Sequence, residues 1–127
     1  MQTRNTRQRD AIRDVLLAAE GPLSPPEVLE RARKEQPGLG IATVYRTLKM
    51  LLDEGALHAV NLPGDAARYE VQNKPHHHYF QCQDCGVVLN VYACPSGLKA
   101  LAPKGCVVET HEVWLAGKCA ECAPDAG

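Results

Sequence analysis

The sequence predicts an α+β fold made of two small domains, residues 1–73 and 74–127. Apolar residues recur at helical spacing in three segments before residue 55, and two short strand patterns follow with a turn between them. After Lys74-Pro75 the pattern becomes rich in strands. Each domain is too short to bury a large apolar core, so at least one should need a metal staple or a partner chain.

The first two predicted helices have recognisable boundaries. Apolar residues at helical spacing run from Ala11 to Ala19, and a Gly-Pro pair ends the pattern. Ser24 can cap a second helix, in which Pro25 suits the first turn and Glu27 completes a capping box. Both helices therefore have sequence signals at an end as well as a periodic apolar face.

A third helix and a hairpin complete the first domain. The helix is predicted over residues 42–54, and Gly55 stops it. Strands are predicted around residues 57–62 and 68–71, with a turn at residues 63–65. Three helices followed by a two-stranded hairpin are the parts of a winged helix-turn-helix.

The second domain is predicted to be a small α/β unit. Strand patterns cover residues 77–82, 87–92 and 106–115, and a short helix fits between residues 96 and 101. No apolar run approaches the roughly 20 residues of a membrane helix, and the first residues lack a secretory h-region. We therefore expect a cytoplasmic protein that does not interact with membranes.

Four of the six cysteines form two Cys-x-x-Cys pairs, Cys82 with Cys85 and Cys119 with Cys122. The cytosol keeps thiols reduced, so these pairs favour metal over disulfides. Two such turns can supply four thiolates to one tetrahedral zinc ion, in a closed structural site. The alternatives are a redox dithiol and free buried thiols, but no βαβ unit accompanies the pairs.

The third predicted helix has a polar stripe beside its buried one, and such a helix can enter the major groove of DNA. The alternative is a solvated helix face. The net charge of −1 does not itself suggest nucleic acid, although residues 1–13 hold four arginines and one aspartate. The candidate DNA-binding residues are Arg4, Arg7, Arg9, Thr43, Tyr45, Arg46 and Lys49.

An ordered set of motifs resembles the ferric uptake regulator (Fur) superfamily over nearly the whole chain. The resemblance implies a homodimeric repressor that binds operator DNA when its regulatory metal is present, with the second domain as the dimerisation domain. The motifs are Thr6-Arg7-Gln8-Arg9, Ala42-Thr43-Val44-Tyr45-Arg46-Thr47-Leu48, Arg68-Tyr69-Glu70, His76-His77-His78, Cys82-Gln83-Asp84-Cys85-Gly86, His111, and Gly117-Lys118-Cys119-Ala120-Glu121-Cys122.

The three consecutive histidines can serve two metal sites, because neighbouring side chains on a strand alternate faces. The resemblance implies a hinge site that uses His77 and Glu70, and a second site that uses His76, His78 and His111. Short histidine-rich tracts often bind metal, which favours this interpretation over a solvated run.

The chain departs from the family pattern at both sites. At the hinge site, Tyr79, Pro22 and Asn90 stand where the family usually has two histidines and an acidic residue. We expect His58 to complete this site. The alternative for His58 is a surface residue of the strand that binds no metal. The alternative for Glu70 is an ion pair with an arginine.

In the second site the usual glutamate has no counterpart that aligns. Cys94 is the best substitute, ahead of Glu109 and Glu112. The alternative for Cys94 is a small buried apolar residue. Cys106 stands where the family tends to carry an aromatic residue, and we predict that it belongs to the core.

The predicted function is that of a metal-dependent, DNA-binding transcriptional repressor, not an enzyme. Its five histidines outnumber the one carboxylate that aligns, which favours zinc over manganese or iron as the second divalent metal. The alternative within the family is an iron- or manganese-responsive regulator. A zinc hydrolase, a constitutive DNA architectural protein and an iron-based peroxide sensor are less consistent with the residues.

Overall fold

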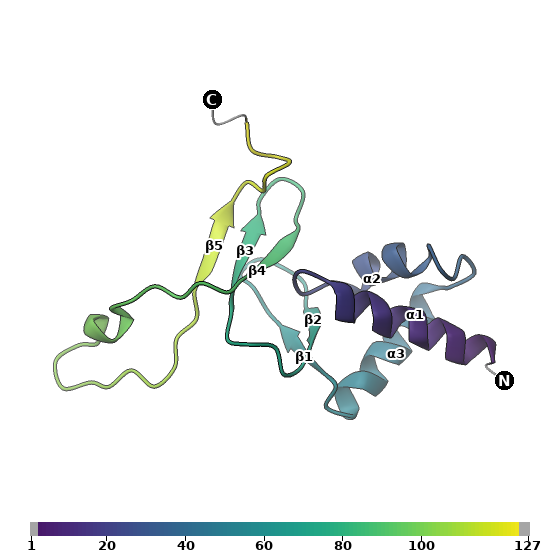
Figure 1. Ribbon diagram of the computed structural model, residues 1–127, viewed down its shortest axis with the longest axis horizontal. Coiled ribbons are helices and arrows are strands. Elements are labelled where there is room, and N and C mark those ends of the chain that lie inside the picture. Colours follow the sequence, from purple (N-terminus) through teal and green to yellow (C-terminus); the bar gives the residue numbers. More distant parts are fainter. Residues whose placement is uncertain (1–2, 125–127) are drawn as a thin grey trace. The chain divides into compact units, whose positions relative to one another are not determined.

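The computed structural model describes residues 3–124 and divides the chain into two compact units, Met1–Lys74 and Pro75–Gly127. Figure 1 shows the elements in chain order, and each unit is described by itself. Within the described residues, no helix is long and apolar enough to cross a membrane. The elements are α1 (Arg4–Ala18), α2 (Pro25–Ala32), α3 (Ile41–Asp53), β1 (Leu57–Val60), β2 (Arg68–Val71), β3 (His78–Cys82), β4 (Val88–Val91), the 3₁₀-helix η1 (Leu98–Leu101) and β5 (Trp114–Gly117).

The predicted capping box of α2 is confirmed. The Ser24 side chain accepts a hydrogen bond from the Glu27 amide, and the Glu27 carboxylate accepts one from the Ser24 amide. This arrangement satisfies two backbone donors at the start of the helix. At the start of α1, the Thr3 side chain accepts from the amide of Thr6 in the same way.

The core of the first unit lies among its three helices and the adjacent strand pair. Ile12 of α1, Val28 of α2 and Val44 of α3 are each 0% exposed. Their apolar neighbours on the same helix faces are buried with them, including Leu16 and Leu48. The periodic apolar positions in the sequence therefore form the predicted inward faces.

Strands β1 and β2 pair antiparallel, with His58 opposite Glu70. The hairpin is attached to the helices by two backbone hydrogen bonds between Leu23 and Tyr69, which form an isolated antiparallel bridge. The segment before α2 thereby extends the edge of β2.

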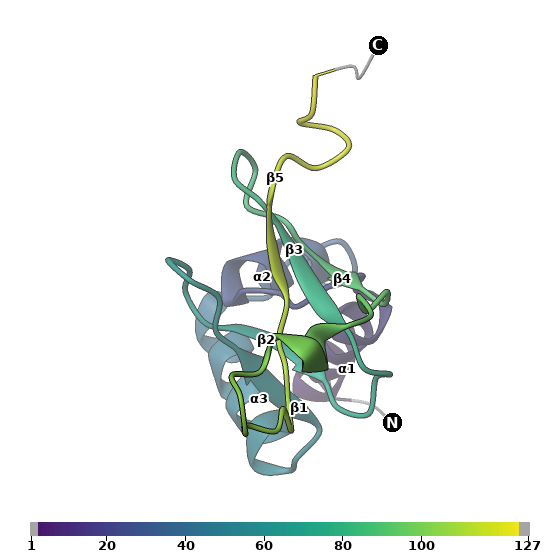
Figure 2. The same cartoon turned by 90° about the vertical axis from the view of Figure 1, so that its left-hand side faces the viewer.

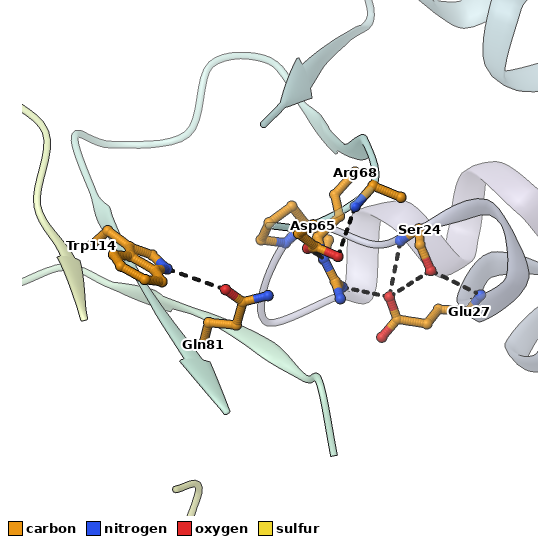
Figure 3. Close-up of polar contacts among 8 residues, drawn as sticks. Ser24, Glu27, Asp65, Arg68, Gln81 and Trp114 are labelled. Carbon is orange, nitrogen blue, oxygen red and sulfur yellow. Dashed lines mark hydrogen bonds and ion pairs between the residues drawn. The ribbon is translucent and has the colours of Figure 1, made fainter. Parts of the chain in front are cut away.

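A buried arginine also connects the hairpin to α2 (Figure 3). Arg68 is 5% exposed, and its guanidinium donates to the carboxylates of Glu27 and Asp65 and to the Pro22 carbonyl. The same Glu27 oxygen accepts from the Ser24 hydroxyl at 2.8 Å. One side chain therefore joins the hairpin turn to the capping box.

The second unit contains a three-stranded sheet in the order β4-β3-β5 (Figure 2). Strand β3 pairs antiparallel with β4 and parallel with β5. The prediction of a strand over residues 106–115 is wrong for most of its length, because β5 begins only at Trp114. Just before β5, the Val113 carbonyl accepts a hydrogen bond from the Tyr79 amide, so pairing with β3 is confined to the end of the predicted segment.

The second unit buries few apolar side chains. Within the part of this unit up to Pro124, the buried apolar residues are Val88, Cys82 and Cys119, whereas Leu101 is 76% exposed. The prediction that Cys106 belongs to the core is wrong, because this thiol is exposed on the long connection between β4 and β5. An apolar core this small agrees with the expectation that the unit needs a metal or a partner chain.

Candidate metal centres and nucleic-acid interface

The four cysteines of the two Cys-x-x-Cys pairs meet at one end of the β-sheet. Their sulfur atoms all lie within 4.8 Å of one another, with Cys85 Sγ and Cys119 Sγ 3.7 Å apart. Zinc–sulfur bonds of about 2.3 Å place tetrahedral sulfurs about 3.8 Å apart. The spacing therefore fits a zinc ion held by Cys82, Cys85, Cys119 and Cys122.

Backbone amides stabilise negative charge on one sulfur of this cluster. The amides of Cys85 and Cys119 each donate to Cys82 Sγ at 3.4 Å, and they lower the pKa of Cys82 to about 6. Hydrogen bonds with the Cys119 and Cys82 sulfurs raise the pKa of Cys122 to about 12. One thiolate is therefore stabilised by the protein itself, whereas Cys122 needs a bound cation to lose its proton near neutral pH.

Three histidines and one cysteine form a second cluster at the other end of β3. His76 Nε2 lies 3.1 Å from His78 Nε2, which lies 3.5 Å from Cys94 Sγ. The same sulfur lies 3.0 Å from His111 Nε2. These four ligand atoms all lie within 4.8 Å of one another. We name this group the His₃Cys cluster.

The dimensions of the His₃Cys cluster suit a tetrahedral metal. With bonds of about 2.0 Å to nitrogen and 2.3 Å to sulfur, neighbouring ligand atoms lie about 3.3–3.5 Å apart. Val113 donates its amide hydrogen to His78 Nδ1 at 3.0 Å, which orients this ring. Burial, followed by the charges of His76 and His111, lowers the pKa of His78, so the ring stays uncharged and available as a ligand.

Of the two glutamates considered as alternatives to Cys94, Glu112 lies near the cluster. Its Oε2 is 3.9 Å from His78 Nδ1, and its side chain is 80% exposed. The Nδ1 atom is not the one that faces His76 and Cys94. Within the described residues, neither Glu112 nor Glu109 joins the group of possible ligands.

His77 lies outside the His₃Cys cluster. Its Nδ1 is 2.8 Å from the Pro75 carbonyl oxygen, and its ring contacts those of Tyr79 and Tyr92. Nearby on β4, Asn90 donates from Nδ2 to the Tyr92 hydroxyl, while its buried Oδ1 has no hydrogen-bond partner among residues 3–124. His76 and His77 precede β3, which begins at His78, and His77 makes its contacts apart from those of His76 and His78.

His58 and Glu70 meet on the strand pair of the first unit. His58 Nε2 lies 2.8 Å from Glu70 Oε1, and His58 Nδ1 lies 3.1 Å from Gln72 Oε1. Glu70 is 1% exposed. Both ring nitrogens of His58 therefore face oxygen atoms. This arrangement is compatible with hydrogen bonds between the side chains and also with a shared metal ion.

The outward face of α3 carries the polar residues that the sequence singled out. Tyr45 is 54% exposed, and Arg46 is exposed and donates to the Thr43 hydroxyl at 3.0 Å. Lys49 pairs with Asp53 one turn later.

One arginine of α1 lies beside this face, since Arg9 contacts Met50 Sδ at 3.7 Å. Arg4 and Arg7 of the same helix are exposed. A cavity of about 290 Å³ opens between α1 and α3. Asn5 and Met50 also line this cavity. Neither was predicted from the sequence, because their positions on two helices become neighbours only in the folded unit. The cavity is lined by Asn5, Arg9, Thr43, Arg46, Thr47 and Met50.

A single strand contributes to both metal-ligating clusters. His78 is the first residue of β3 and Cys82 is the last. Strand β5, paired with β3, is likewise bounded by His111 before it and Cys119 after it. The four steps along β3 correspond to about 13 Å at the rise of an extended strand.

Comparison with known proteins identifies the family. The profile of the Ferric uptake regulator family matches residues 1–114. The ferric uptake regulation protein of Campylobacter jejuni is 30% identical over 123 residues, covering 92% of this chain and 78% of that protein. Alignments with other ferric uptake regulation proteins span 55–64% of the length of those proteins.

Solved structures of the same kind share the fold. One described as a zinc-bound manganese uptake regulator has a TM-score of 0.78 and 26% identity, with 92% of this chain and 91% of that chain aligned. The ferric uptake regulator of Helicobacter pylori, described as having three functional metal binding sites, has a TM-score of 0.66 and 26% identity, with 98% and 85% aligned.

Two cysteine- and histidine-rich clusters on a mixed helix-and-strand fold define a metal-binding protein. This chain belongs to the ferric uptake regulator family, whose members are metal-responsive transcription regulators and not enzymes. The names of its relatives include both iron and manganese, so membership alone leaves the metal of this chain open.

Proposed function

We propose that this chain is a cytoplasmic, metal-dependent repressor that binds operator DNA as a homodimer, with zinc as its regulatory metal. The target genes would be those of metal uptake or homeostasis. The observation that carries this proposal is the His₃Cys cluster, in which side chains from three separate segments place their ligand atoms within 4.8 Å of one another. Such an assembly is typical of a site that binds a metal ion.

The four-cysteine cluster is proposed to hold a structural zinc. It ties the end of β3 to the segment after β5, and two of its four cysteines are buried. A closed set of four thiolates leaves no position for a substrate or a catalytic water. Because the second unit has little apolar core, zinc binding here would supply folding energy directly.

The first unit is proposed to be a winged helix-turn-helix, with α3 as the recognition helix and the β1–β2 hairpin as the wing. The exposed ring of Tyr45 and the guanidinium of Arg46 can reach base edges or phosphates. Thr43 and Lys49 lie on the same helix, and the arginines of α1, Arg4, Arg7 and Arg9, are proposed to contact the DNA backbone.

The second unit is proposed to form the homodimer interface. Strand β5 is an edge strand of the sheet and is exposed at Trp114 and Leu115. Tyr92, Leu101 and Val107 are also exposed. A second copy of the chain would cover apolar side chains and an open strand edge that would otherwise favour aggregation.

Zinc is favoured over manganese and iron because of the donors in the His₃Cys cluster. Three imidazoles and a thiol suit zinc, whereas manganese prefers carboxylate and water ligands. Asn90 supplies an amide where an acidic ligand was expected. The alternative, iron or manganese, is supported by the buried carboxylate of Glu70 beside His58. His77 and this His58–Glu70 pair remain candidate regulatory ligands.

Binding to a selected operator duplex at buffered free metal tests the proposal. We expect half-maximal binding at far lower free zinc than free manganese or iron. The His78→Ala and His77→Ala variants should lose the zinc response, whereas Glu109→Ala, an exposed change outside both clusters, should keep it. Equal binding by zinc-loaded and regulatory-metal-free dimers, with activation by manganese or iron, would establish the alternative.

Cobalt distinguishes the ligands of the regulatory site from those of the structural site. With zinc held in the four-cysteine cluster, cobalt added to the second site should give a thiolate-to-cobalt charge-transfer band in wild type. That band should be absent in Cys94→Ser and present in Cys106→Ser, which changes an exposed cysteine outside either cluster.

A further inference from the structure

Cys94 occupies an unusual position among the six cysteines. In the four-cysteine cluster Cys82 and Cys119 are buried, Cys122 is half-buried and Cys85 is exposed, while Cys94 is exposed on the connection after β4. Its sulfur is nevertheless within 3.5 Å of two imidazole nitrogens, those of His78 and His111. The thiol is thus both a potential metal ligand and open to small molecules from solvent.

The His₃Cys cluster has a single sulfur, so its one thiol is also its most oxidisable ligand. The other three ligands are the imidazoles of His76, His78 and His111. A thiolate is the nucleophilic form of cysteine, and its oxidation follows thiolate character and access. Removal of this one donor would reduce the protein ligands from four to three.

We propose that Cys94 is a site of reversible oxidation by hydroperoxides, through which an oxidant releases the regulatory metal and the DNA. This inference rests on the proposed function and adds a second input to the same site. The oxidant class is hydrogen peroxide or an organic hydroperoxide, either of which can reach an exposed sulfur.

The step is a two-electron transfer with one oxygen atom. A lone pair of Cys94 Sγ attacks the terminal hydroperoxide oxygen, so an S–O bond forms while the O–O bond breaks. The transferred oxygen keeps its hydrogen, so the thiolate becomes the sulfenic acid directly, and the hydroxide or alkoxide that leaves is protonated by solvent. Sulfur is oxidised and the peroxide is reduced. A low-molecular-weight thiol can then form a mixed disulfide and, with a second thiol, restore Cys94.

The consequence follows from the ligand geometry. A sulfenic acid at Cys94 is a poor substitute for a thiolate, and its oxygen must occupy space beside His111, whose Nε2 is only 3.0 Å from the sulfur. The remaining imidazoles would bind zinc more weakly. Zinc in the four-cysteine cluster should be retained, because that cluster closes around two buried sulfurs.

The test uses the full-length dimer with zinc in both clusters, less than one equivalent of hydrogen peroxide, dimedone to trap sulfenic acid, and mass spectrometry. We expect Cys94 to be labelled first, about one zinc to be released to a chromophoric chelator for each Cys94 labelled, and the operator affinity of the oxidised fraction to fall at least tenfold. Reduction of untrapped samples with dithiothreitol, followed by added zinc, should restore binding.

Two variants complete the test. Cys94→Glu keeps a potential fourth ligand without a thiol, so its zinc-dependent binding should resist peroxide. Cys106→Ser removes an exposed thiol from the same connection and should remain as sensitive as wild type. Labelling first at Cys85 or Cys122 in wild type, or loss of binding without modification of Cys94, would overturn the inference whatever the variants do. Failure of the proposed function is distinguishable, because wild type would then not respond to zinc before peroxide is added.

Discussion

His58 and Glu70 lie directly opposite each other on β1 and β2, with His58 Nε2 2.8 Å from Glu70 Oε1. The glutamate side chain is 1% exposed and the histidine side chain 37% exposed. A carboxylate so deeply buried needs hydrogen-bond donors, and this imidazole can supply one. The pair therefore has a structural role within the first unit whether or not it also binds metal.

The first prediction concerns this pair. His58→Ala should lower the free energy of unfolding by about 2 kcal/mol, because it removes a partner of a buried carboxylate. Urea unfolding of zinc-loaded protein measures the effect. Glu70→Gln, which keeps the shape and can still accept a hydrogen bond, should cost less. A stable His58→Ala variant that has lost its metal response would instead favour a ligand role.

The second prediction concerns the buried guanidinium of Arg68. Arg68→Ala should lower the free energy of unfolding by about 3 kcal/mol, because it leaves Glu27 and Asp65 without a shared cation. Arg68→Lys should recover only part of this loss, since one ammonium does not reproduce the forked contacts. Thermal or urea unfolding provides the measurement, and an unchanged midpoint in Arg68→Ala would contradict the network's importance.

The third prediction concerns the structural zinc. Cys119→Ser should remove bound zinc and the folded dimer together, because Cys119 contributes both a sulfur ligand and one of the few buried positions of the second unit. Metal analysis and analytical ultracentrifugation are the measurements. A variant that keeps one tight zinc per chain and stays dimeric would disprove the four-thiolate assignment.

The fourth prediction concerns DNA recognition. Tyr45→Ala and Arg46→Ala should each weaken operator binding by roughly tenfold, the effect of losing one good base or phosphate contact. Both residues are exposed, so metal content and thermal stability should not change. Fluorescence anisotropy with the same duplex measures affinity. Wild-type affinity in both variants would place the DNA-reading surface elsewhere.

The fifth prediction concerns pH. Burial lowers the pKa of His78, so in the folded chain this ring resists protonation that it would accept when unfolded. Its contribution to stability is fully present above the ordinary histidine pKa of about 6.5 and is lost as pH falls below it. Protein with only structural zinc should therefore melt at lower temperature as pH drops through 6. His78→Gln should flatten this dependence; an equally steep profile would assign it to other groups.

Local signals predicted the first unit well. Ser24 and Glu27 marked the start of α2 correctly because a capping box involves residues only three apart. Periodic apolar residues identified the inner faces of all three helices, where Ile12, Val28 and Val44 are buried. The Arg68 network was not foreseen, since it joins residues up to 46 positions apart, and sequence spacing says little about such contacts.

The structure of the second unit was predicted less well from the sequence. A strand was predicted over residues 106–115, yet β5 begins only at Trp114, and Cys106 is exposed. The expected separation of His77 from His76 and His78 is present, but His76 and His77 precede β3, so alternation along a strand is not its cause. The 3.0 Å approach of Cys94 to His111 depends on the path of the connection between them, which periodicity does not encode.

Strand β3 begins with a ligand of one cluster and ends with a ligand of the other. Zinc bound by Cys82 and Cys119 would hold β3 and β5 in register, and His111, shortly before β5, has its ring 5.0 Å from that of His78. Binding of zinc at both clusters should therefore be linked, each ion raising the affinity of the chain for the other by the same factor. In a cell short of zinc, the structural and the regulatory zinc would then leave the chain together. This coupling should appear as a steeper zinc-binding curve than two independent sites allow.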